Sequence, residues 1–560
     1  MIGWRLLCAG LLLVAVTTSA AAGLSVLAGK LGASSAWIAV LLGVVVATLA
    51  STRAEATRQK MTIADIVVLA FFALVSARAF LWLIYADTGE LKVLSPNNLG
   101  DMALHLNLIH RWANGGTFWP DNPFLAGAPF AYHPGMDLWN ALLRTLGVPV
   151  YQGLRWTGLL GSAAAAAALW RWGGGFAAAA FLFAGGFGFL DLMQTNLAWK
   201  NPFLAMFVTQ RGLLYSLPAG LVLLAVWRAQ LDNTGGPTLP VTAQAALYAT
   251  MPLFNAPAFL FLSIVLAACT LVGWRKNLAR PFIVTGLLSI IPATWLVHLV
   301  TAGFTVSTGF RLAPGWMQDD GGLWFWMMNF GIFLPLMVIL GFTVFRRPEA
   351  TDSSKVMYFT GIATLAFCFI FQLAPWAWDN TKLILWGYLA LAPILSHELL
   401  ARWRPWAQTI ACFTLFAAGG SALLVGLDAR HGYQLAERSE LAEAQVMLRK
   451  IPVNARLACA PGYEHPALLL GQPVVMGYDG HLYSQGIDYA PVEQELNRLM
   501  SGGNDWTNAA RSLGIHYVFW GRREAQRWPQ STQPWKSCGR LLSASEHGEL
   551  YQITPCLLED

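Results

Sequence analysis

The sequence predicts a polytopic α-helical membrane protein that ends in a small α/β domain. Of its 560 residues, 56% are hydrophobic and only 12% are charged, which does not suit one soluble core. Runs of about 20 apolar residues recur along the chain, and this is the length that an α-helix needs to cross a membrane. Beyond residue 427 charge rises, and helix-like stretches alternate with strand-like ones.

About thirteen membrane spans are predicted from the apolar runs. They lie at 4–28, 34–50, 62–84, 152–170, 175–191, 212–229, 241–254, 255–273, 282–302, 323–345, 356–373, 381–400 and 407–427. The first is predicted to be an uncleaved helix, because its apolar run reaches Val26. The stretch 241–273 is interrupted by Asn255 and Pro257, so it predicts either two spans or a re-entrant hairpin.

Basic residues between the spans predict their orientation. Those that fall on one side are Arg53, Arg58, Lys60, Arg171, Arg275, Lys276, Arg280, Arg346, Arg347, Arg402 and Arg404. The excess of Lys and Arg in cytoplasmic loops makes this side cytoplasmic, together with the N-terminus. The segments 85–151, 192–211, 303–322, 374–380 and 428–560 are then extracytoplasmic.

The sequence divides into two predicted domains. Residues 1–427 form the membrane domain, with a large first outer loop at 85–151, and residues 428–560 form the extracytoplasmic α/β domain. In the second domain, 456–460 and 515–520 are typical of strands, and 490–501 and 505–513 of helices. Cys538 and Cys556 could form a disulfide in this compartment or remain free thiols.

The first outer loop holds the most informative acid of the chain. Gly100 and Asp101 begin a stretch with apolar residues at 102, 106 and 109, which predicts a helix lying along the membrane surface. Asp is a favoured N-cap, and His105 suits an interface, so neither residue requires a function. The other interpretation of Asp101 is a catalytic carboxylate, with His105 one helical turn away.

Two further outer loops supply cations. Asp191, Lys200, Gln210 and Arg211 flank the second loop, and an Arg there could either extend to lipid head groups or bind a phosphate through its fork of donors. An aromatic belt and an N-cap explain Asp379 at the start of the twelfth span. They do not explain Lys382, a cation that enters that apolar span. Lys382 therefore indicates an anionic partner such as a lipid phosphate.

These features suit transfer of a group from a phosphorylated lipid. The carboxylate would take the proton of an acceptor hydroxyl, and the cations would stabilise charge on the departing phosphate.

The layout of the chain resembles the GT-C superfamily of polytopic glycosyltransferases, in a bacterial branch. These enzymes use sugars linked to polyprenyl phosphate or dolichyl phosphate. The motifs that carry the resemblance are Gly100-Asp101, Tyr132-His133-Pro134-Gly135, Gln210-Arg211-Gly212, Trp378-Asp379-Asn380-Thr381-Lys382, Gly477-Tyr478-Asp479-Gly480-His481 and Gly514-Ile515-His516-Tyr517-Val518.

The resemblance implies roles for individual residues. Asp101 would be the general base, and Asp191 would match a second acid. Arg211, Lys382 and Lys200 would hold the donor phosphate. The other residues expected to bind substrate are His105, His133, Gln210, Asp379 and His481. Many members carry paired acids where this chain has Asp101-Met102, so no cofactor is certain, and a divalent metal is possible but not favoured.

We therefore predict an inverting glycosyltransferase of the bacterial inner membrane. It would transfer a sugar from a polyprenyl-phosphate-linked donor to an envelope glycan, lipid or protein, with its C-terminal domain in the periplasm. Membrane lipid is an expected partner and nucleic acid is not. The alternatives are a non-catalytic envelope scaffold, and a transporter or flippase of lipid-linked saccharides. A transporter requires ionisable residues deep in several spans, and the sequence has few.

Overall fold

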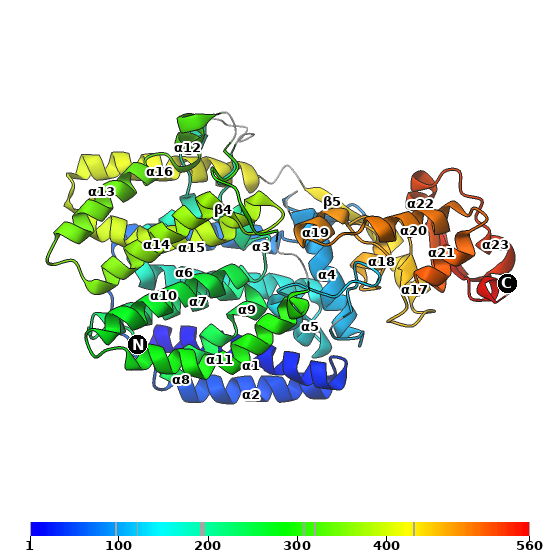
Figure 1. Cartoon of the computed structure of the whole chain (residues 1–560), viewed down its shortest axis with the longest axis horizontal. Coiled ribbons are helices and arrows are strands. Elements are labelled where there is room, and N and C mark those ends of the chain that lie inside the picture. Colours follow the sequence, from blue (N-terminus) through cyan, green and yellow to red (C-terminus); the bar gives the residue numbers. More distant parts are fainter. Residues whose placement is uncertain are drawn as a thin grey trace.

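The computed structural model describes residues 2–95, 98–119, 121–190, 197–305, 309–318, 321–428 and 432–558. Long helices lie side by side in one bundle, and the segment after residue 432, the C-terminal region, extends from one end of it (Figure 1). Helices α4 and α5 lie between the two parts.

The bundle confirms the predicted polytopic α-helical fold. Its helices are α1 Ile2–Ala28, α2 Ala33–Ser51, α3 Ile63–Leu81, α6 Val150–Phe183, α7 Leu213–Leu231, α8 Val241–Ala249, α9 Met251–Phe254, α10 Ala256–Trp274, α11 Arg280–Val300, α12 Gly322–Phe330, α13 Phe333–Arg346, α14 Asp352–Ile370, α15 Thr381–Ile394 and α16 Pro405–Gly426. Among the described residues, 9 helices are long and apolar enough to cross a membrane, and the bent pair α12 and α13 brings the number to 10. The remaining predicted spans correspond to the two halves of α6 and to the short pair α8 and α9.

Helix α6 contains a sharp turn between two predicted spans. At Gly173–Gly174 the backbone leaves helical values, with φ of −157° and +66°. Before the turn, Arg155 Nη2 donates to the Ile84 carbonyl beyond the end of α3 at 2.9 Å. After it, Phe181 stacks on Phe72 in the middle of α3. The two halves therefore run in opposite directions along α3.

Two other predicted spans are interrupted. The run 323–345 becomes α12 and α13, which are bent by 78°. The break lies at Gly331, whose φ is +54° and whose Cβ, if present, would lie 3.0 Å from the Gly186 Cα. The stretch 241–273 breaks at Asn255, whose Oδ1 accepts from the Ala258 N–H at 2.8 Å and so begins α10. Both interruptions place loop-like backbone at the same end of the bundle.

The basic ends of the helices gather at the other end of the bundle. Arg171 Nη2 donates to the Thr57 carbonyl at 2.7 Å, and Lys276 pairs with Asp352. Arg347 in turn donates to the Glu398 carbonyl at 3.0 Å. The basic residues predict that these helix ends lie on the same side of the membrane. In the structure, these ends contact one another through such pairs.

Helix α4, Leu99–Ala113, is a core helix and not the expected surface helix. Its residues from Met102 to Ile109 are all buried. It packs on α5, Gly135–Thr145, and on α18, Pro466–Leu469. Asn107 Nδ2 donates to the Leu468 carbonyl at 2.7 Å. The C-terminal region covers the face of α4 that carries Asn107.

Two sheets organise the C-terminal region and join it to the first outer loop. A three-stranded antiparallel sheet has the order β1-β2-β5, so a hairpin of the loop pairs with the start of the C-terminal region. A four-stranded sheet has the order β6-β7-β9-β8, with β6 and β7 parallel. The strands are β1 Tyr85–Asp87, β2 Glu90–Val93, β5 Tyr433–Glu437, β6 Leu457–Ala458, β7 Tyr517–Gly521, β8 Arg540–Ala544 and β9 Gly548–Gln552; β3 Arg311–Leu312 and β4 Phe371–Gln372 pair beside the bundle.

The helices of the C-terminal region are short. They are α17 Arg438–Leu448, α18, α19 Asp479–Ser484, α20 Ala490–Ser501, α21 Trp506–Ser512, α22 Arg522–Arg527 and α23 Trp535–Cys538. The elements predicted at 456–460, 490–501, 505–513 and 515–520 appear as β6, α20, α21 and β7. Of the two alternatives for Cys538 and Cys556, the structure contains the disulfide.

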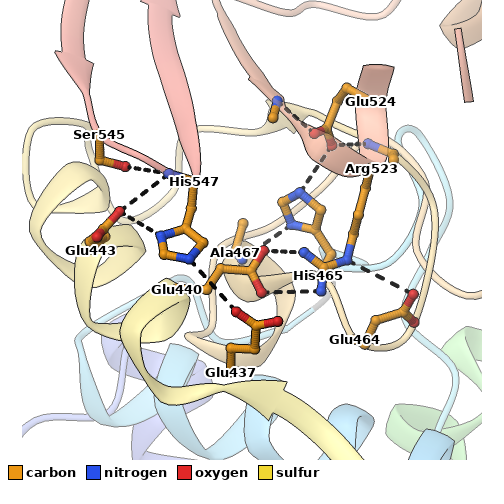
Figure 2. Close-up of polar contacts among 12 residues, drawn as sticks. Glu437, Glu440, Glu443, Glu464, His465, Ala467, Arg523, Glu524, Ser545 and His547 are labelled. Atoms are coloured by element: carbon orange, nitrogen blue, oxygen red, sulfur yellow. Dashed lines mark hydrogen bonds and ion pairs between the residues drawn. The ribbon is translucent and has the colours of Figure 1, made fainter. Parts of the chain in front are cut away.

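A buried ion pair holds the centre of the C-terminal region (Figure 2). His465 Nε2 lies 3.1 Å from Glu524 Oε1, and both side chains are buried. The same carboxylate accepts from the N–H groups of Ala460 and Gly521 at 2.7 and 2.8 Å. Burial opposes the charge on His465, but interactions with Cys459 and Glu524 outweigh it and raise the pKa of His465 to about 10.

We predict that Glu524→Leu destabilises the C-terminal region by about 3–5 kcal/mol, because it leaves a buried cation, the buried N–H of Ala460 and the half-buried N–H of Gly521 without an acceptor. The thermal midpoint and the protease sensitivity of the detergent-solubilised chain measure this effect. Glu546 is exposed, so the matched control Glu546→Leu should stay within about 0.5 kcal/mol. Equal behaviour of the two variants would contradict the prediction.

Candidate functional site

A cavity of about 2130 Å³ lies at the end of the bundle opposite the basic ends, beside the C-terminal region. Nine of the ten residues predicted for the site line it, although they come from segments far apart in the chain. They are Asp101, His105, His133, Lys200, Gln210, Arg211, Asp379, Lys382 and His481. Asp191, the predicted second acid, lies outside the described residues.

Asp101 is not the N-cap of its helix. Helix α4 begins at Leu99 after Asn98, which occupies the N-cap position, so Asp101 lies in the first turn. Its carboxylate is half-buried and, among the described residues, accepts no hydrogen bond. A capping role therefore does not account for Asp101.

The electrostatic surroundings of Asp101 make it a stronger base than an exposed aspartate. Burial is the main cause that raises its pKa, and the negative charges of Asp379 and Asp137 act in the same direction. The neighbouring His105 and Lys382 oppose this rise. A carboxylate with a raised pKa accepts a proton more readily, as a general base requires.

His105 is held by two acceptors on opposite sides of its ring. Its Nδ1 lies 2.8 Å from Asp137 Oδ1, and its Nε2 lies 3.2 Å from the Thr209 carbonyl oxygen. Because a carbonyl oxygen only accepts, Nε2 carries a proton. Nδ1 is held by the Asp137 carboxylate. Both ring nitrogens have protein partners, so the ring of His105 is held in a fixed position beside the cavity.

Asp137 is a site residue that the sequence reasoning missed. It lies in the first turn of α5, two residues after Gly135, and is buried. It faces His105 and interacts with Arg211 and Asp101 electrostatically. The only signal in the sequence was its place shortly after the Tyr132–Gly135 motif, since nothing local indicates that α5 packs on α4.

Three cations from the bundle line the cavity, and we call Lys200, Arg211 and Lys382 the cationic wall. Arg211 is 1% exposed, and its Nε, Nη1 and Nη2 have no hydrogen-bond partner among the described residues. Burial lowers its pKa to about 10, although Asp137 opposes this. A buried guanidinium without a partner is costly, and an anion in the cavity would satisfy its donors.

The other two cations of the cationic wall differ in their contacts with the protein. Lys382 Nζ lies 3.0 Å from Asp379 Oδ1, so Asp379 orients the cation. The turn between them is anchored by Asn380, whose Nδ2 donates to the carbonyls of Cys368 and Phe371 at 2.8 and 2.7 Å. Lys200 is exposed on the wall of the cavity.

Two neutral histidines complete the predicted set. His133 Nδ1 donates to the Pro252 carbonyl at 3.1 Å. Burial, aided by the charge of Lys382, lowers the pKa of His133 to about 4. Burial, aided by His105, lowers the pKa of His481 to about 4 as well. Both rings are therefore uncharged at neutral pH and can act as hydrogen-bonding groups.

Gly212 explains why Arg211 lies where it does. A Cβ on Gly212 would lie 1.9 Å from the Phe254 carbonyl oxygen, so only glycine allows this approach of α7 to the end of α9. The close contact brings Arg211 and Gln210 beside the interruption at Asn255, which also lines the cavity. Within the described ranges, no group of three or more His, Cys, Asp or Glu side chains is arranged to hold a metal ion.

No protein-family model matches the chain, and no curated protein sequence is similar to it. Among solved structures, the chain is similar to the apo oligosaccharyltransferase of Archaeoglobus fulgidus, with 12% identity, 82% of this chain and 69% of that chain covered, and a TM-score of 0.40. It is also similar to the arabinofuranosyltransferase AftD from Mycobacteria, with 15% identity, 89% and 42% covered, and a TM-score of 0.48.

We predict that Arg211→Met stabilises the unliganded protein by about 1–3 kcal/mol, because it removes a buried charge that has no hydrogen-bond partner among the described residues. Millimolar inorganic phosphate should raise the thermal midpoint of the wild-type chain and leave that of the variant unchanged. The midpoints of detergent-solubilised protein, with and without phosphate, measure both effects.

Arg456 provides the matched control. Its guanidinium is bound by Asp121 and by the carbonyls of Asn122 and Val474, so Arg456→Met should lower the midpoint. A lower thermal midpoint for Arg211→Met would contradict the prediction, because it would mean that the Arg211 side chain stabilises the unliganded protein.

Proposed function

We propose that the chain is an integral-membrane glycosyltransferase that transfers a sugar from a polyprenyl-phosphate-linked donor to an acceptor outside the cytoplasm. The acceptor is an envelope glycan, lipid or protein. The observation that carries this proposal is the buried Arg211, which has no hydrogen-bond partner among the described residues and lines the same cavity as Asp101, a half-buried carboxylate with a raised pKa. A base and an anion-binding donor set are the two parts that displacement of a lipid phosphate needs.

In the proposed reaction, the acceptor hydroxyl attacks the anomeric carbon from the side opposite the phosphate. A new carbon–oxygen bond forms as the bond from the anomeric carbon to the phosphate oxygen breaks. The bonding electrons leave with that oxygen, and the hydroxyl proton passes to Asp101. A single displacement of this kind inverts the configuration of the anomeric carbon.

The cationic wall receives the negative charge that builds on the leaving phosphate. Arg211 offers a planar fork of donors, which matches phosphate oxygens better than a single ammonium. Lys382 adds a point charge whose position is set by Asp379. His133 and Gln210 line the same cavity without net charge and are suited to the hydroxyl groups of the sugar.

The arrangement of the bundle supports an extracytoplasmic site; the membrane that we propose is the bacterial inner membrane. The basic helix ends lie together at one end, and the cavity lies at the other. With the basic end in the cytoplasm, the cavity and the C-terminal region face the periplasm, where a lipid-linked donor reaches the site from the bilayer.

We predict that Asp101→Asn lowers transfer by about 10²–10⁴-fold, the usual contribution of a positioned base. Donor affinity should remain close to that of wild type. Arg211→Gln and Lys382→Gln should instead weaken donor binding. The assay uses the purified chain, a polyprenyl-phosphate sugar and an envelope extract, with transfer followed by mass spectrometry.

Asp488 is exposed and does not line the cavity, so Asp488→Asn is the matched control and should retain full transfer. Full transfer by Asp101→Asn would reject the base. Movement of the donor across vesicles without any transfer would favour a flippase, and neither activity would favour a scaffold.

We predict an acid limb in the pH profile of transfer that lies above the ordinary range for an aspartate, because Asp101 must be ionised to act and burial raises its pKa. Transfer should fall as the pH drops through that raised pKa. Removing the cation in Lys382→Gln should move the limb to higher pH, since Lys382 lowers the pKa of Asp101. The remote Lys92→Gln should leave the limb in place, and an unmoved limb in both variants would contradict the assignment to Asp101.

A further inference from the structure

The C-terminal region contributes a wall of the cavity that carries no net charge. The residues from this region that line the cavity are Tyr463, Tyr478, Gly480, His481, Tyr483, Ser484 and Gln485. None is acidic or basic except His481, which burial keeps neutral by lowering its pKa to about 4. This wall contrasts with the cationic wall.

The rings on this wall are held in defined positions. Tyr478 packs edge-to-face on Tyr463, with centroids 5.4 Å apart and planes at 88°. It packs in the same way on His481, at 5.1 Å and 89°. A Cβ on Gly480 would lie 2.6 Å from the Tyr478 ring, so glycine is required where the chain passes it. The aromatic surface is thus organised before any ligand binds.

The wall begins next to Asp101. A Cβ on Gly100 would lie 3.4 Å from His481 Nε2 and 3.6 Å from the Tyr478 ring. The first turn of α4 therefore lies directly against these rings. A molecule resting on this wall would present a group to Asp101 from the side of the C-terminal region.

The wall also contains a hydrogen-bond acceptor that lacks a donor. Gln485 Oε1 is buried and has no partner among the described residues, although its side chain lines the cavity. A buried acceptor without a donor is costly, and a ligand hydroxyl would satisfy it. Tyr483 is 56% exposed, so its ring is open to contact with a ligand.

We infer that the acceptor is a neutral saccharide bound on the aromatic wall, which consists of Tyr463, Tyr478, His481, Tyr483 and Gln485. This inference rests on the proposed function and selects one of its three acceptor classes. A sugar presents apolar C–H faces to aromatic rings and hydroxyl groups to neutral polar side chains. A phosphate or an acidic acceptor finds its counter-charge on the cationic wall and not here. A lipid chain would leave Gln485 unsatisfied.

The test measures binding of the acceptor separately from transfer. A panel of methyl glycosides of glucose, galactose, mannose, arabinose and N-acetylglucosamine is titrated into the full-length chain in detergent, with saturation-transfer NMR as the readout. At least one glycoside should bind the wild-type chain. Tyr483→Ala and Gln485→Leu should weaken that binding by about tenfold, whereas Tyr483→Phe should retain it.

Tyr433 lies on β5 and does not line the cavity, so Tyr433→Ala is the matched control and should bind like wild type. Arg211→Gln should also leave glycoside binding unchanged, because it acts on the donor. Absence of binding by every glycoside, or equal binding by Tyr483→Ala and wild type, would overturn the inference even if transfer to a peptide or lipid were observed. Glycoside binding that depends on Tyr483 supports it even if no transfer is detected, in which case only the proposed enzymatic function fails.

Discussion

The burial of α4 between the bundle and the C-terminal region is the constraint on which the site depends. One face of this helix packs on α5 and places His105 against Asp137. The other face packs on α18, where Asn107 binds the backbone. Because both of these faces of α4 are covered, the Asp101 side chain is directed into the cavity. The same packing half-buries its carboxylate and raises its pKa.

The cavity separates two kinds of chemistry. Its cationic wall belongs to the bundle, with Lys382 in the first turn of α15, and the aromatic wall belongs to the C-terminal region. Within the part of the chain that the structure describes, the Arg211 guanidinium lacks acceptors and Gln485 Oε1 lacks a donor. Native proteins rarely leave such groups buried without reason. Arg211 belongs to the cationic wall and Gln485 to the aromatic wall. Their missing hydrogen-bond partners therefore indicate two different ligands, one anionic and one rich in hydroxyl groups.

Interruptions of the helices help to bring the side chains that line the cavity together. Asn255 ends α9 and begins α10 beside Arg211, and Gly331 bends α12 away from α13. Apolar runs of this length are expected to continue as straight spans, and hydropathy does not reveal where backbone leaves the helix. The interruptions lie at the end of the bundle that holds the cavity, where loop-like backbone can line a polar space.

The apolar runs, the segregated basic residues and the alternating pattern after residue 427 were enough to predict the membrane fold and the elements of the C-terminal region. They sufficed because hydropathy and side-chain periodicity are local properties. Cations and acids in the outer loops also identified residues that prove to line one cavity. Only the tertiary structure decided that Asp101 is not a helix cap, that Asp137 holds His105 and that the Arg211 guanidinium has no hydrogen-bond partner among the described residues. Those properties depend on contacts such as that of His105 with Thr209, 104 residues away, and no local pattern encodes them.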